Sequence, residues 1–71
     1  MDWDEISTRL SALTVRELRE IGRRHFAGSL GGASAKYELV QAMVTQMRYW
    51  SRLESESAKS KLQAALQEIG A

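Results

Sequence analysis

The sequence predicts an all-α protein, a small domain of four helices, from three observations. Apolar residues recur every three or four positions in four separate stretches, which is the spacing of one helix face. Residues that commonly cap helices, Asp2, Thr14 and Ser34, stand before the first three stretches. A length of 71 residues leaves room for one core, so residues 1–71 are expected to form a single helical domain.

The first helix is predicted over residues 2–13. Asp2 is a favourable N-cap, and Asp4 and Glu5 follow in the first turn, where the helix dipole favours anions. The apolar residues of this segment lie on one helical face: Trp3, Ile6, Leu10 and Leu13. Trp3 is therefore expected to anchor the helix to the rest of the domain.

The second helix is predicted over residues 15–25. Thr14 and Glu17 have the spacing of a capping box, in which each side chain accepts a hydrogen bond from the other residue's backbone N–H. Gly22 lies inside the helix at a cost of about 1 kcal/mol relative to alanine, and it marks either a close approach of another helix or fraying. The last turn is basic, as suits the carbonyl end of a helix: Arg23, Arg24 and His25.

A loop and the central helix follow. Residues 26–33 contain three glycines, and Phe26 and Leu30 are expected to pin this loop to the core. The third helix is predicted to begin with Ser34 as its N-cap and to end near Trp50. Its apolar face is the strongest in the chain: Leu39, Val40, Met43, Val44, Met47 and Trp50. Tyr37 and Tyr49 are expected in the core or at its edge.

Residues 51–71 read as a polar linker and a C-terminal helix over residues 58–69. Ser55 or Ser57 is the expected cap, and Gly70 the expected stop. The apolar residues again share one face: Leu62, Ala65, Leu66 and Ile69. We favour a break after the third helix over one continuous rod.

The composition argues against several classes of function. The chain has no cysteine and one histidine, which leaves no thiolate zinc site, disulfide or cysteine nucleophile. No pair of catalytic side chains and no phosphate-binding glycine motif is present, so neither an enzyme nor a bound cofactor or metal is expected. The apolar runs are too short for a membrane span, and no secretory signal opens the chain. We expect a soluble, intracellular binding protein.

The charge of the chain is uneven although its formal sum is only +1. Residues 14–52 carry +4, whereas residues 1–13 carry −2 and residues 53–71 carry −1. A basic middle is typical of a surface that binds phosphates, and it is equally compatible with an ordinary solvated surface. Spacings of four residues allow Glu20 to neutralise Arg16 and Arg24, which would favour the second interpretation.

Residues 13–48 resemble the SAP-domain family of helix–extended-loop–helix modules, which is related to the N-terminal domain of the Rho terminator and to LEM modules. The similarity rests on Leu13-Thr14-Val15-Arg16-Glu17-Leu18-Arg19 and, after the loop, Lys36-Tyr37-Glu38-Leu39-Val40. Two departures are that Ser34 stands where the family usually has glycine, and that the loop is longer. The resemblance implies a SAP-like core over residues 14–50 that binds duplex DNA, with a preference for A·T-rich sites.

The residues themselves support DNA binding on separate grounds. The N-terminus of the third helix offers free backbone N–H groups to a phosphate, and nearby cations would add counterion release. Too few cations are present for more than weak binding. The candidate DNA contacts are Arg19, Arg23, Arg24, Gly31, Gly32, Ser34 and Lys36.

The alternative function is protein binding without nucleic acid. A regulator or inhibitor, such as one encoded by a phage, would use a helix face for a protein partner or for self-association. The candidate residues for that face are Trp3, Leu62 and Leu66.

Overall fold

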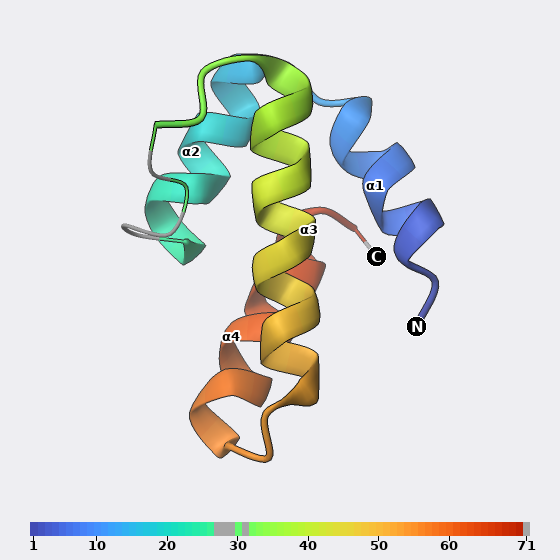
Figure 1. Ribbon diagram of the computed structural model, residues 1–71, viewed down its shortest axis with the longest axis vertical. Coiled ribbons are helices and arrows are strands. Elements are labelled where there is room, and N and C mark those ends of the chain that lie inside the picture. Colours follow the sequence, from blue (N-terminus) through green and yellow to red (C-terminus); the bar gives the residue numbers. More distant parts are fainter. Residues whose placement is uncertain (27–29, 31, 71) are drawn as a thin grey trace.

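The computed structural model describes residues 1–26, 30 and 32–70, and this part of the chain forms four α-helices (Figure 1). They are α1 (Trp3–Ser11), α2 (Val15–His25), α3 (Lys36–Arg52) and α4 (Glu56–Glu68). The predicted all-α class is confirmed. The central helix α3 packs against each of the other three helices. In Figure 1, α2 and α3 begin at the same end of the molecule and run the same way, whereas α1 and α4 run the opposite way.

The first two helices are separated by a short turn. α1 begins where the Asp2 carboxylate accepts a hydrogen bond from the Glu5 backbone N–H (3.1 Å). It ends at Ser11, two residues earlier than predicted, because Thr14 already caps α2. The predicted capping box is present: the Thr14 N–H donates to Glu17 Oε1 (2.9 Å) and the Glu17 N–H donates to Thr14 Oγ1 (3.1 Å). The predicted bounds of α2 are confirmed.

The start of α3 differs from the prediction. Ser34 is not the N-cap; Ala35 is, and it has an extended backbone with ψ of 150°. The Ser34 hydroxyl lies 3.5 Å from the Glu38 carboxylate, so it donates to that acid and does not cap an amide. Glu38 sets this register because its Oε1 accepts the Ala35 N–H at 2.9 Å. At its other end α3 continues two residues past Trp50, to Arg52.

The expected break between α3 and α4 is confirmed. Leu53 and Ser55 have extended backbones, and Ser55 caps α4 by accepting the Ala58 N–H at 3.3 Å. The helix therefore begins two residues earlier than predicted. Gly70 follows it with φ of 75°, the left-handed conformation that stops a helix and favours glycine.

The core lies between α3 and the helices around it. Phe26, directly after α2, is 2% exposed, and its ring stacks on Trp50 with centroids 5.1 Å apart. Gly22 is buried, and a side chain there would collide with Leu30, which packs on the same core. The close approach at this glycine therefore comes from a loop residue and not from another helix. The buried apolar residues are Ile6, Leu10, Leu18, Ile21, Phe26, Leu39, Val40, Met43, Met47, Trp50, Ala58, Leu62 and Ala65.

The molecule is flat. Its principal extents are 31 × 24 × 16 Å, and helices pack about 8–10 Å apart, so the shortest extent holds two layers of helix. Figure 1 looks down this short axis, with α3 in the front layer and α4 behind it. Within the described ranges, no helix combines the length and apolar character needed to cross a bilayer.

Candidate nucleic-acid interface

Three of the predicted phosphate contacts, Arg19, Ser34 and Lys36, lie near the starts of α2 and α3. Arg19 on α2 donates a hydrogen bond from Nη2 to the Ser34 carbonyl oxygen, 3.5 Å away. The pKa of Glu17 on α2 is lowered, mainly by its hydrogen bonds with Thr14 and also by the positive charge of Lys36, the first residue of α3. The structure thus brings Arg19 of α2 close to Ser34 and Lys36 at the start of α3.

At the start of α3, the Glu38 carboxylate is the one side-chain acceptor for backbone N–H groups among the described residues. Glu38 Oε1 accepts the backbone N–H groups of Ala35 (2.9 Å) and Ser34 (3.3 Å), and these bonds lower the pKa of Glu38. The N-cap Ala35 has no side-chain acceptor, and no other side chain in the described residues caps α3. The N–H groups of Lys36 and Tyr37 therefore have no side-chain acceptor among the described residues, and the Glu38 carboxylate lies beside them.

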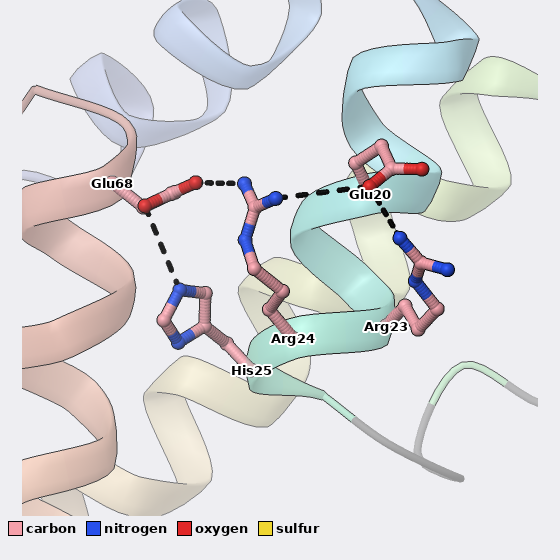
Figure 2. Close-up of polar contacts among 5 residues, drawn as sticks. All are labelled: Glu20, Arg23, Arg24, His25 and Glu68. Atoms are coloured by element: carbon pink, nitrogen blue, oxygen red, sulfur yellow. Dashed lines mark hydrogen bonds and ion pairs between the residues drawn. The ribbon is translucent and has the colours of Figure 1, made fainter.

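The two arginines at the end of α2 lie in ion pairs (Figure 2). Arg23 Nη2 lies 2.6 Å from Glu20 Oε2, and Arg24 Nη1 lies 3.7 Å from the same oxygen. Arg24 also binds Glu68 on α4. The predicted Glu20–Arg24 pair is present, whereas Arg16 pairs with no carboxylate in the described part of the chain. Arg23 and Arg24 are therefore neutralised locally, unlike Arg19 and Lys36.

His25 lies next to the same ion pairs but forms no hydrogen bond with their carboxylates. Its Nε2 is buried and has no hydrogen-bond partner among the described residues, and it lies 3.7 Å from Glu68 Oε2. This distance is too long for a hydrogen bond. Figure 2 shows the imidazole pointing toward Glu68 from α2.

The predicted site contains two glycines, and the structure describes one of them. Gly31 lies outside the described residues. Gly32 is exposed, and a Cβ placed on it would have no atom within 4 Å. Packing against the described residues therefore does not require glycine at position 32.

The apolar residues proposed for a protein partner are used by the chain's own core. Leu62 is 8% exposed and belongs to the buried cluster. Trp3 and Leu66 are half-buried and pack against that cluster, so Trp3 anchors α1 as expected. These three side chains do not form an exposed apolar face.

Two aromatic residues lie on the surface instead. Tyr37 is 67% exposed and Tyr49 is 50% exposed, so the expectation that they belong to the core or its edge is wrong. The helical register of α3 directs them away from the face that buries Met43 and Met47. Placing each residue of α3 by its angle around the helix axis would have found this from the sequence.

A hollow lies away from this site, between the end of α2, α3 and α4. It is an open depression of about 470 Å³, and its polar lining includes His25, Gln46 and Lys61. The Arg24 side chain at its edge is engaged with Glu20 and Glu68. Among the described residues, no group of three or more possible ligands could hold a metal ion.

Comparison of the chain with protein-family models, curated proteins and solved structures finds no match.

Proposed function

We propose that this chain is a SAP-like nucleic-acid-binding module that contacts duplex DNA phosphates with the surface where α2 and α3 begin. One observation carries the proposal. Arg19 and Lys36 flank the first turn of α3, where the N-cap Ala35 offers no side-chain acceptor, and neither forms an ion pair with a carboxylate in the described ranges. A phosphate at this point would meet two cations and free backbone N–H groups.

The neighbouring carboxylates weaken this attraction, because Glu17 and Glu38 remain negatively charged while they accept backbone N–H groups. Arg16 lies one turn before Arg19 on the same side of α2 and is also exposed. Three cations that contact phosphates imply a dependence of log affinity on log salt with a slope of about −3. Binding should therefore be weak and strongly sensitive to salt.

The other candidate residues are buried or paired with carboxylates, and this reduces the number of residues in the proposed site. Arg23 and Arg24 would first have to exchange their carboxylate partners for phosphates, so we place them at its margin. Protein binding through Leu62 would require exposing a core residue. The proposed contacts are Arg16, Arg19, Gly32, Ser34 and Lys36.

The test is a titration of the isotope-labelled chain with a short A·T-rich duplex at about 50 and 200 mM salt, followed by backbone amide shifts. We expect shifts at Arg19 and from Ser34 to Tyr37, with affinity falling by roughly 40-fold between the two salt concentrations. Absence of binding at the lower salt concentration would refute the proposal and leave protein binding as the function to test.

A matched pair of variants locates the site. Arg19→Gln with Lys36→Gln removes two positive charges from the proposed surface. Lys59→Gln with Lys61→Gln removes two from α4, where both lysines are exposed. We expect the first variant to bind at least about tenfold more weakly and the second to bind nearly as wild type, with unchanged circular dichroism in both. Equal losses would show attraction by overall charge and not by this site.

A further inference from the structure

One side of α3 is exposed along its whole length. Residues spaced four, four, three and four apart share a helical face, and the bundle covers none of those on this side. They are Tyr37, Gln41, Thr45, Arg48 and Arg52. The core residues Leu39, Val40, Met43, Met47 and Trp50 lie on the opposite side. We call the exposed set the outer face of α3.

The outer face is open because of the two-layer arrangement. α1 and α2 flank α3 and α4 lies behind it, and no other helix crosses in front of it in Figure 1. The face extends from Tyr37, the residue after Lys36 of the proposed phosphate site, to Arg52, a rise of about 22 Å at 1.5 Å per residue. That length matches about seven base pairs of duplex.

The outer face carries positive charge without acidic neighbours on its own helix. The one acid of α3 is Glu38, and its carboxylate is turned to the backbone of Ser34 and Ala35. Arg48 and Arg52 are exposed and form no ion pair with any described carboxylate. By contrast, the arginines at the end of α2 are neutralised by acids.

The uncharged side chains on and beside the outer face can form hydrogen bonds with a nucleic acid. Tyr37, on the outer face, and Tyr49, at its margin next to Arg48, are two of the three large hydrophobic residues that the described chain leaves exposed, and a tyrosine can donate a hydrogen bond to a phosphate. Gln41 and Thr45, in the middle of the outer face, carry uncharged donors and acceptors of the kind that bind base edges.

We propose that the outer face of α3 is a second contact surface for the same duplex, with Arg48 and Arg52 binding phosphates and Gln41 and Thr45 facing base edges. This inference rests on the proposed function. It extends the contact from the start of α3 to its end. α1 limits the surface on one side, because its first turn carries Asp4 and Glu5.

The test compares two variants with equal charge change. Arg48→Gln with Arg52→Gln alters the outer face, and Lys59→Gln with Lys61→Gln alters α4. We expect the arginine variant to bind the duplex at least about tenfold more weakly at 50 mM salt, with a slope of log affinity against log salt shallower by about 2. Amide shifts at Gln41 and Thr45 should accompany wild-type binding.

The outcomes separate this inference from the function on which it rests. If Arg19→Gln with Lys36→Gln weakens binding while the Arg48 and Arg52 variant matches the lysine control, the outer face is not a contact surface and the proposed function stands. If the wild-type chain binds no duplex at 50 mM salt, the proposed function fails and this inference with it. Tighter binding of a single strand of the same sequence would overturn the choice of duplex.

Discussion

Replacement of Phe26 by alanine should remove a large part of the stability of this domain. Phe26 is 2% exposed and stacks on Trp50 at 5.1 Å, so its removal leaves a cavity between the end of α2 and α3. Such substitutions cost about 3–5 kcal/mol. A domain of 71 residues has a total stability of about 4–11 kcal/mol, so the variant should retain at most roughly three quarters of it and should unfold at the lower limit.

The assay is urea denaturation followed by far-ultraviolet circular dichroism, because Trp3 would confuse a fluorescence signal from Trp50. Phe26→Leu keeps most of the buried volume and loses the ring pair, so it should cost about 1–2 kcal/mol. Tyr49→Ala is the control, since Tyr49 is half exposed beside Trp50 and should change stability by about 0.5 kcal/mol or less. A loss below about 1 kcal/mol for Phe26→Ala would refute the packing described for this residue.

Three further predictions concern Gly22, the two capping glutamates and Leu62. Gly22→Ala should change the stability of the wild-type chain by less than about 1 kcal/mol, because the Leu30 methyl group must move aside and this cost opposes the gain in helix propensity. In a Leu30→Ala chain the same substitution should stabilise by up to about 1 kcal/mol, and equal changes in the two backgrounds in urea denaturation would exclude this contact. The folded-state pKa values of Glu17 and Glu38 lie below the ordinary 4.5, so their contribution to stability is present above that pH and is lost as the pH falls through the folded values. Replacing both by glutamine should flatten the acid side of the urea midpoint against pH, and an unchanged profile would contradict their capping role. Leu62→Ala should cost about 2–5 kcal/mol in thermal or urea denaturation, whereas a side chain that serves only a partner would cost almost nothing.

Local signals in the sequence predicted most of the fold. The Thr14–Glu17 capping box fixed the start of α2 because both hydrogen bonds join residues three apart and need no tertiary partner. Ser34 misled the prediction for α3, because a serine can direct its hydroxyl to another side chain when a nearby glutamate caps the helix instead. Ser34 and Glu38 are both able to cap α3, and the composition of the segment does not decide between them.

The candidate site was predicted less completely than the fold. The sequence placed Arg19, Ser34 and Lys36 near one another through the similarity to a helix–extended-loop–helix module, and the structure brings them together. The sequence did not show that Arg24 would be paired with an acid, because its partner Glu68 lies 44 positions later in the chain. The exposure of Tyr37 and Tyr49 was also missed, because aromatic residues were assigned to the core by type and not by their position around the helix.

The sequence alone determined where helices form and which side of each is buried, because apolar spacing and capping act over three or four residues. Only the tertiary structure decided which arginines have no carboxylate partner among the described residues and which apolar residues stay exposed for a protein partner. Both depend on contacts between helices: Glu68 on α4 neutralises Arg24 on α2, and the core takes up Leu62. The open outer face of α3 has the same origin, since helices around three sides of α3 leave the fourth uncovered.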